Sequence, residues 1–251
     1  MVGELLAKCE GIVIRAIDYG ETSKIITVFS KELGKTSLMA RGAKKPVSKL
    51  ASVSQIFTQG HYLFHIGSGM GTLQQGEITQ HFRAIHEDIV LLAYVTYIAE
   101  CIDRITIERQ PNVPLYESCL QIFHYLAEGY DPEVILQIFE VKMISLLGIA
   151  PELSQCVNCG EVSTHYAFSM QEGGLLCRKC LWIDPHKISI SQKAIKLLRL
   201  FQMIDISRLG EISISVETKN EIRIVLDLYL EKNSGLYLKS KKFLRQVHQL
   251  Q

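Results

Sequence analysis

The hydrophobic period of this 251-residue chain changes near residue 80, and this change constrains the fold more than any other feature. In residues 56–66 the even positions form one face that includes Ile56, Tyr62 and Phe64, while polar residues such as Gln59 alternate with them. In residues 88–107 the apolar positions recur at helical spacing instead. A period of two indicates half-buried strands, and a period of about 3.6 indicates amphipathic helices. We therefore expect an α+β protein whose strands precede its helices.

Short apolar runs rich in Ile and Val fill the first 80 residues, and glycine-containing turns separate them. The runs that we interpret as strands are residues 11–17, 24–29, 56–66 and 72–78. Roughly five short strands in such a segment suggest a small closed barrel, for which the OB-fold is the usual solution. We predict that residues 1–80 form an OB-fold domain.

The rest of the chain, residues 81–251, is expected to form a helical domain. Helical spacing, prolines at helix starts and the candidate N-cap Ser191 indicate helices over residues 88–107, 115–126, 133–147, 194–203 and 217–231, followed by a short segment over 239–248. A cysteine-containing module interrupts these helices at about residues 153–184.

Four of the seven cysteines form two CxxC pairs separated by seventeen residues: Cys156, Cys159, Cys177 and Cys180. Each pair can place two thiolates on one tight turn, and two such turns can hold one tetrahedral zinc ion. Four thiolates leave no open coordination position, so the predicted zinc is structural rather than catalytic. Two unrelated thiol pairs or a redox site are the alternatives. The other three cysteines lie in apolar surroundings and are expected to be inert.

No Asp or Glu occurs between Glu32 and Glu77, and five basic residues lie in that interval: Lys35, Arg41, Lys44, Lys45 and Lys49. Residues 1–80 carry nine Lys or Arg against six Asp or Glu, a net charge of +3, which leaves −2 for the rest of this +1 chain. On an OB-fold, such a stretch predicts a nucleic-acid interface that uses basic side chains and stacking rings. A merely solvated loop is the alternative. Candidate rings are Tyr19, Phe57, Tyr62 and Phe64, most of which we expect in the core.

A second basic cluster lies near the carboxy terminus and comprises Lys239, Lys241, Lys242 and Arg245. These residues could extend a DNA-binding surface, or they could be favourable charges late in a helix. The sequence favours neither interpretation over the other.

Cysteine pairs of metal-binding type indicate a reducing compartment, and no apolar run is long enough for a membrane span, so we expect a cytoplasmic protein without a membrane partner. No nucleophile elbow, P-loop or His–Glu metal motif is found, and we expect no enzymatic activity. A zinc-ribbon transcriptional regulator that reads duplex DNA and a scaffold that binds only proteins are the competing functions. The few basic residues of the cysteine module argue against the first, and the basic stretch argues against the second.

Several runs in the first 50 residues resemble the amino-terminal domain of the RecO family of bacterial recombination mediators. They are residues 11–15, 18–21, 24–29, 34–35 and 40–46. The resemblance continues through the helical middle, the cysteine module and a closing Leu238-Lys239-Ser240 segment, and so covers nearly the whole chain. The sequence departs from the family pattern at Ser23, where an acidic residue is expected before the lysine. The cysteine module is complete here, although some family members lack it.

The resemblance implies an amino-terminal OB-fold and a carboxy-terminal helical domain with an inserted zinc module. It also implies DNA repair and homologous recombination: binding of single- and double-stranded DNA, annealing of complementary strands, and help in loading the recombinase onto coated single strands. The partners that it implies are a RecR-type mediator ring and single-stranded DNA-binding protein, in the cytoplasm at the bacterial nucleoid.

Overall fold

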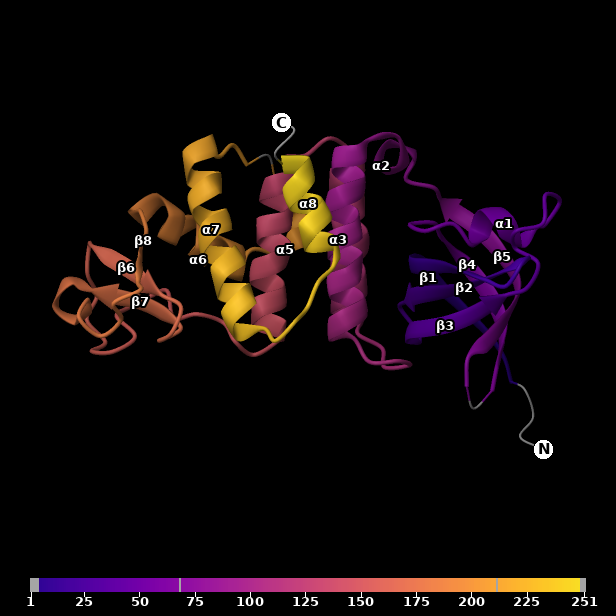
Figure 1. Cartoon of the computed structure of the whole chain (residues 1–251), viewed down its shortest axis with the longest axis horizontal. Coiled ribbons are helices and arrows are strands. Elements are labelled where there is room, and N and C mark those ends of the chain that lie inside the picture. The colour runs from indigo at the N-terminus through magenta and orange to yellow at the C-terminus, as the bar shows by residue number, and fades with distance from the viewer. Residues whose placement is uncertain (1–4, 68, 211, 249–251) are drawn as a thin grey trace. The chain divides into compact units, whose positions relative to one another are not determined.

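The computed structural model describes residues 5–67, 69–210 and 212–248 (Figure 1). Packing divides them into two compact units. The first holds the residues up to Glu128 together with those from Leu238 onward, and the second holds Gly129–Tyr237. The change in hydrophobic period near residue 80 falls inside the first unit, whose strands are followed by helices. The described residues contain no helix that is both long enough and apolar enough to cross a membrane.

The first unit contains a closed five-stranded barrel. Its strands are β1 (Leu5–Tyr19), β2 (Ser23–Ser30), β3 (Gly34–Ala40), β4 (Gln59–Ile66) and β5 (Gly71–Gln80). They are joined in the order β1-β2-β3-β5-β4, and β1 closes the barrel by pairing with β4. Only the short β3–β5 contact is parallel. This is the strand order of an OB-fold, and the predicted fold class is confirmed.

The barrel interior is filled by side chains that alternate along the strands. Directly opposed residues share a face, so the paired Ala16, Ile26 and Leu38 line the interior of three adjacent strands. The predicted inward face of β4 is confirmed at Tyr62 and Phe64, which are fully buried. The strand itself begins later than the alternation predicts.

Strand β4 starts at Gln59 rather than at residue 56 because Phe57 adopts a left-handed backbone conformation, with φ of 62°. The short helix α1 (Leu50–Val53) precedes this turn and packs against β5, where Val53 contacts Gly76. The Tyr62 hydroxyl donates to the Thr58 carbonyl oxygen at 2.9 Å and thereby satisfies a polar group inside the barrel.

Four helices complete the first unit: α2 (Arg83–Glu87), α3 (Ile89–Ile105), α4 (Val113–Ala127) and α8 (Ser240–His248). Asp88 caps α3 by accepting hydrogen bonds from the backbone N–H groups of Val90 and Leu91. Asn112 caps α4 in the same way through Leu115. Helix α8 packs against α3 through buried apolar side chains, so the end of the chain returns to the amino-terminal unit.

The connector between α3 and α4 lies along β3. Glu108 accepts a hydrogen bond from the Ser37 backbone N–H at 2.7 Å, and the Arg109 N–H donates to the Lys35 carbonyl oxygen at 2.7 Å. Gly34 begins β3 with φ of 64°, and a Cβ at this position would collide with the Gln110 carbonyl. The connector therefore pairs with the edge of β3 at its amino-terminal end.

The second unit contains helices α5 (Pro132–Leu146), α6 (Gln192–Met203) and α7 (Val216–Asn233) and a small antiparallel sheet. The sheet strands are β6 (Tyr166–Ser169), β7 (Gly174–Cys177) and β8 (Ile188–Ser189), in the order β7-β6-β8. Single 3₁₀ turns, η1 (Arg178–Cys180) and η2 (Ile206–Arg208), follow β7 and α6. The predicted helix starts are accurate to within two residues, and Ser191 caps α6 as expected, by accepting from the Ala194 N–H.

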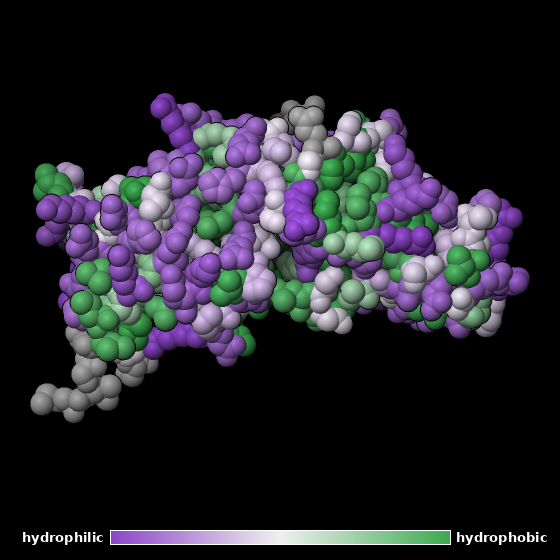
Figure 2. All heavy atoms as spheres, turned by 180° about the vertical axis from the view of Figure 1, so that it is seen from behind, coloured by the Kyte–Doolittle hydropathy of each residue, from purple (hydrophilic) through white to green (hydrophobic). Residues whose placement is uncertain are grey.

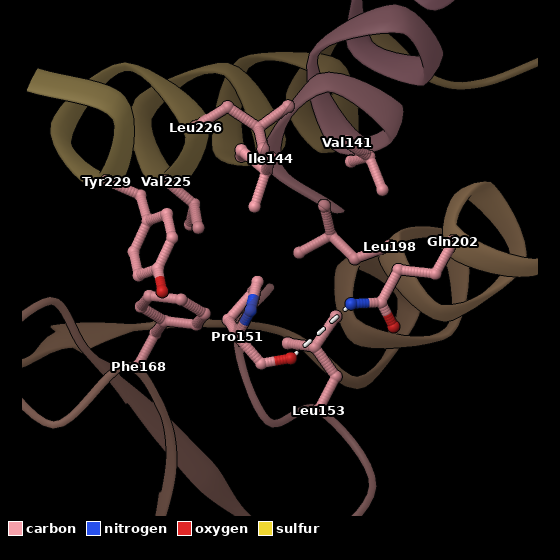
Figure 3. Close-up of a pocket in the computed structure, with 10 residues that line it drawn as sticks. All are labelled: Val141, Ile144, Pro151, Leu153, Phe168, Leu198, Gln202, Val225, Leu226 and Tyr229. Atoms are coloured by element: carbon pink, nitrogen blue, oxygen red, sulfur yellow. Dashed lines mark hydrogen bonds between the residues drawn. The ribbon is translucent and has the colours of Figure 1, made fainter. Parts of the chain in front are cut away.

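An apolar pocket marks the place where α5, α6 and α7 meet the cysteine-containing segment (Figure 3). Side chains from all of these elements point into it, including Ile144, Leu153, Phe168 and Leu226. Its polar groups are bonded to backbone carbonyls: the Gln202 amide donates to Pro151 at 3.4 Å, and the Tyr229 hydroxyl donates to Ile149 at 2.7 Å. The pocket belongs to the core of the unit and joins the sheet to the helices.

Glu100 of α3 holds the start of α8, and its removal is expected to loosen that helix. Its carboxylate accepts from the backbone N–H groups of Lys239 and Ser240 at 3.1 and 2.8 Å, and also from the Ser240 hydroxyl. A hydrogen bond to a charged group contributes about 2 kcal/mol to the stability of a folded protein. We therefore expect Glu100→Ala to lower the free energy of unfolding by about this amount in urea denaturation.

The pH dependence distinguishes this role from general packing. Burial opposes ionisation of Glu100, but the Ser240 and Lys239 donors outweigh it and hold its pKa below the ordinary 4.5. Because the pKa is lower in the folded state, ionised Glu100 stabilises the fold above pH 4.5. This contribution to the free energy of unfolding is lost as the pH falls through the folded-state pKa. Glu100→Gln should remove that part of the acid sensitivity. An unchanged acid profile in the glutamine variant would contradict the assigned role.

Candidate metal centre and nucleic-acid interface

The four cysteines of the two CxxC pairs come together at one point of the second unit. The Sγ atoms of Cys156, Cys159, Cys177 and Cys180 all lie within 4.8 Å of one another. The Cys159 and Cys177 sulfurs are 3.7 Å apart. A tetrahedron with metal–sulfur bonds of about 2.3 Å has edges of about 3.8 Å, so this spacing suits a single zinc-sized ion. The cluster could therefore bind a metal ion.

Backbone geometry presents these sulfurs. Gly160, with φ of 72°, closes the first knuckle by donating its N–H to the Cys156 carbonyl oxygen at 2.9 Å. Val157 donates to Leu175 of β7, which ties this knuckle to the strand that leads to Cys177. The Cys177 N–H points at the Cys156 sulfur at 3.4 Å, and the Asn158 amide points at Cys180 at 3.3 Å. Such N–H donors to sulfur are typical of the outer shell of metal–thiolate sites.

The thiols of Cys156 and Cys159 differ in how readily they ionise. Burial works against the Cys156 thiolate, but backbone N–H groups led by that of Cys177 outweigh it and lower its pKa to about 6. The pKa of Cys159 rises to about 12: the Glu161 N–H favours its thiolate, but burial and the three neighbouring sulfurs outweigh this donor. Thiolates this close repel one another, and a bound divalent cation would let all four ionise.

Four of the five residues in the basic stretch lie on one exposed loop after β3. Arg41, Lys44, Lys45 and Lys49 are exposed on this loop, which we call the basic loop and define as residues 41–49. The loop is fixed to the β1–β2 turn, because the Lys44 N–H donates to the Thr22 carbonyl oxygen at 2.8 Å and the Gly42 N–H donates to the Ser23 hydroxyl at 3.3 Å. Ser23, the departure from the family pattern, thus holds the basic loop in place.

Lys35 lies away from this loop, at the opposite end of β3. Its side chain is largely buried, and its ammonium group pairs with the Asp103 carboxylate at 3.2 Å and also donates to the Asp103 carbonyl oxygen. At about 3.3 Å per residue, Lys35 is about 20 Å along the chain from Arg41. The structure therefore separates Lys35 from the four exposed cations and engages it in an internal ion pair.

Lys44 has the one ion pair recorded for the basic loop. Its ammonium group lies 2.8 Å from the Asp18 carboxylate at the end of β1. This hydrogen bond to Lys44 is the main reason why the pKa of Asp18 falls below its ordinary value. Within the described part of the chain, no ion pair engages Arg41, Lys45 or Lys49. Sequence reasoning missed the role of Asp18, since nothing in the local pattern shows which lysine it contacts.

The carboxy-terminal basic residues belong to α8 and the residue before it. Lys239, Lys242 and Arg245 are exposed, whereas Lys241 is partly buried. The backbone N–H of Lys239 is bound by Glu100, which places its side chain at the start of the helix rather than late in it. These cations lie in the first unit, as the barrel does.

Of the four candidate rings, Phe57, Tyr62 and Phe64 are fully buried, and Tyr19 is 56% exposed. Tyr19 ends β1 beside the turn that holds the basic loop. Other large hydrophobic side chains are also exposed on the first unit, among them Leu5, Leu6 and Ile17. Figure 2 shows one face of the molecule on which hydrophobic residues gather over the barrel, at the lower left.

Known proteins of one family match nearly the whole chain. Residues 3–82 match the family model described as "Recombination protein O N terminal", and residues 86–242 match "Recombination protein O C terminal". "DNA repair protein RecO" of Listeria welshimeri is 46% identical over 242 residues, which cover 96% of this chain and 95% of the relative. The proteins of that name from Bacillus pumilus and Bacillus cereus are each 48% identical over 98% of this chain, and the matches cover 96% and 100% of those relatives. The chain therefore belongs to the RecO family of DNA repair proteins.

Proposed function

We propose that this protein mediates homologous recombination and DNA repair without catalysing a chemical step. It binds single- and double-stranded DNA, anneals complementary strands and helps to load the recombinase onto single strands coated by single-stranded DNA-binding protein. A RecR-type ring is its proposed second partner, and the cytoplasm at the nucleoid is its proposed location. Family membership supports this proposal, and it offers no support for a zinc-ribbon transcriptional regulator. Residues 1–80 are the proposed DNA-binding domain, and residues 81–251 the helical domain.

The observation that carries the proposal is the exposed basic loop, whose backbone N–H groups donate to the Thr22 carbonyl oxygen and to the Ser23 hydroxyl beside the β1–β2 turn. Arg41, Lys45 and Lys49 have no recorded ion pair among the described residues, so their charges are available to phosphates. Phosphate contacts carry little sequence information, and binding is expected to be nearly independent of sequence. Lys35 is outside this phosphate-binding set because Asp103 engages it.

Annealing by such a surface requires no catalytic residue. Two single strands repel each other through their phosphates, and a cationic surface reduces that repulsion while it holds both strands at high local concentration. Pairing then proceeds by the chemistry of the bases alone. Lys239, Lys242 and Arg245 are proposed to offer further phosphate contacts on the same unit. We expect annealing to proceed without nucleotide hydrolysis.

Zinc is the proposed metal of the cysteine cluster, held by Cys156, Cys159, Cys177 and Cys180. Soft thiolate ligands in tetrahedral arrangement favour zinc over harder cations. With four protein ligands the ion has no position for a water molecule, so its contribution is to link two knuckles into one folded segment. The protein's own part is to hold the four sulfurs in position and to donate N–H hydrogen bonds to them.

Replacing one ligand tests the metal proposal. Cys177→Ser should lose the zinc and lower the melting temperature of the protein, because a structural zinc contributes on the order of 10 kcal/mol to the folding of a small domain. The matched control is Cys119→Ala, which removes a buried thiol outside the cluster and should retain one zinc per chain. Elemental analysis gives the stoichiometry. Wild-type protein that holds no metal after purification under reducing conditions would refute the proposal.

The salt dependence of DNA binding tests the basic loop. For a single strand, each phosphate contact contributes about −0.7 to the slope of log affinity against log salt concentration. Replacing Arg41, Lys44 and Lys45 together by alanine should therefore flatten that slope by up to about 2 units. Fluorescence anisotropy with a labelled oligonucleotide at several salt concentrations measures it.

The control for that experiment removes the same charge elsewhere. Lys193, Lys196 and Lys232 are exposed cations of the second unit, and their triple alanine variant should keep the wild-type slope. If the basic-loop variant is folded and zinc-loaded and yet has the wild-type slope, the DNA follows another path. The candidate path would then be the surface of Lys239, Lys241, Lys242 and Arg245.

Asp18 is expected to restrain DNA binding, because it occupies Lys44 in the free protein. Its pKa lies below 3.8, so the carboxylate is ionised throughout the neutral range and the competition does not vary there. Asp18→Asn should raise the affinity for single strands and leave the salt slope close to that of the wild type, because Lys44 is proposed to contact a phosphate in both complexes. In a Lys44→Ala background the same substitution should have little further effect. Equal gains in affinity in both backgrounds would show that Asp18 acts by general electrostatic repulsion of the DNA and not through Lys44.

A further inference from the structure

The outer surface of the barrel carries an apolar patch next to the β1–β2 turn. Ile17 of β1 is opposite Ile25 of β2, and Ile25 is opposite Met39 of β3, so the three share one face across three strands. Tyr19 lies two residues beyond Ile17 on the same face of β1. We call these four residues the apolar platform. Tyr19 and Ile17 are 56% and 42% exposed, and the other two are partly buried.

The platform is the part of this face that the helical connector leaves open. Ser37 is two residues before Met39 on the same face of β3. Its backbone N–H and its hydroxyl both donate to the Glu108 carboxylate. At the far end of the strands Phe29 packs edge-on against Tyr116 of α4, and Lys35 is engaged by Asp103. These contacts leave the end nearest the β1–β2 turn accessible.

Positive charge borders the platform. Arg15 is two residues before Ile17 on the same face and is 57% exposed at its side chain, with a long contact of 3.8 Å to Asp103. Arg41 is two residues after Met39, just beyond the end of β3, and begins the basic loop. Two carboxylates lie near Tyr19: Asp18 is paired with Lys44, and Glu21 is exposed in the turn. A polyanion that crosses the platform would meet Arg15 on one side and Arg41 on the other.

We propose that the apolar platform binds unpaired bases of single-stranded DNA, with Tyr19 as the ring on which a base stacks. This inference deepens the proposed DNA-binding function and rests on it. The surface combines an exposed ring, flanking aliphatic side chains and bordering cations, which are the components with which proteins hold single strands without sequence preference. It also spans β1, β2 and β3 beside the β1–β2 turn, and OB-folds accept oligonucleotides on the face of strands 2 and 3 and at this loop.

The platform makes the protein distinguish single strands from duplexes. A base stacks on Tyr19 only when its face is free, and in a duplex that face is covered by neighbouring base pairs. The basic loop, by contrast, contacts phosphates of both forms. When two bound strands anneal, their bases leave the platform and the product keeps only phosphate contacts. The platform therefore favours binding of the substrates and release of the product.

The test compares the affinity for single-stranded and duplex oligonucleotides of the same length. Tyr19→Ala should weaken single-strand binding by about 5- to 150-fold, the range that loss of one base–aromatic stack produces. Duplex binding should change by less than about twofold. Tyr19→Phe keeps the ring and should bind like the wild type, whereas Tyr19→Leu keeps an apolar side chain without a ring and should resemble the alanine variant. Tyr237→Ala, at an exposed position of the second unit, is the matched control.

A spectroscopic readout reports stacking directly. Trp182 is the single tryptophan of the chain and is exposed. The double variant Trp182→Phe, Tyr19→Trp therefore places one indole at the platform. Its fluorescence should be quenched by single-stranded DNA and little affected by duplex DNA at saturating concentration.

The outcomes separate this inference from the proposed function. If the basic-loop variant loses its salt slope but Tyr19→Ala binds single strands like the wild type, DNA binding stands and the platform is refuted. Equal losses for single strands and duplexes in Tyr19→Ala would also overturn the inference, because they would assign Tyr19 a role in the shape of the loop. Quenching of the double variant's fluorescence by both single-stranded and duplex DNA would also overturn the inference.

Discussion

The contacts of Asp103 and Glu108 with β3 are the constraint on which the proposed DNA-binding surface depends. Asp103 neutralises Lys35, and Glu108 binds Ser37, so the α3–α4 connector is held along one half of the strand. Phe29 packs against Tyr116 of α4 at the same end of the strands. The end of this face nearest the β1–β2 turn, with the apolar platform and the basic loop, is not engaged by these contacts. The helical part of the unit thus limits which part of this face the proposed DNA-binding surface can use.

Within that accessible surface, charge and apolar contact have different tasks. In the proposed function, cations of the basic loop act on any phosphate backbone, which would suit a protein that holds two complementary strands and their duplex. Exposed rings act only on unstacked bases. Asp18 occupies Lys44 in the free protein, so in the proposed complex a phosphate would have to displace it. A surface built in this way can gather strands, let them pair and hold the product less firmly.

Sequence patterns predicted the elements but not the contacts between them. Alternation in β4 identified Tyr62 and Phe64 as inward-facing, and the CxxC spacing identified a cysteine cluster that the structure brings within 4.8 Å. The strand β3 is not among the predicted runs, and β6 to β8 were missed because segments of two to four residues are too short to establish a period. The partner of Lys35 is 68 residues away, and no local pattern reveals it.

The rings show the same limit. Tyr19 and Phe57 were both candidate rings, but Phe57 is buried at a turn with a left-handed backbone, whereas Tyr19 ends β1 in an exposed stretch. Exposure depends on where the strand ends and on what covers it, and both are tertiary properties. The charge of the basic stretch was evident from the sequence, whereas its division into an exposed loop and an internal ion pair was not.

A crosslinking map of DNA on the intact protein tests the central claim most directly. A single-stranded oligonucleotide that carries photoreactive bases is bound to the zinc-loaded protein, irradiated and digested, and the crosslinked peptides are identified by mass spectrometry. We expect crosslinks at Tyr19 and within residues 41–49, and none on residues 103–110, which cover the other end of β3. Crosslinks confined to residues 239–245 or to the cysteine-containing segment would contradict the account.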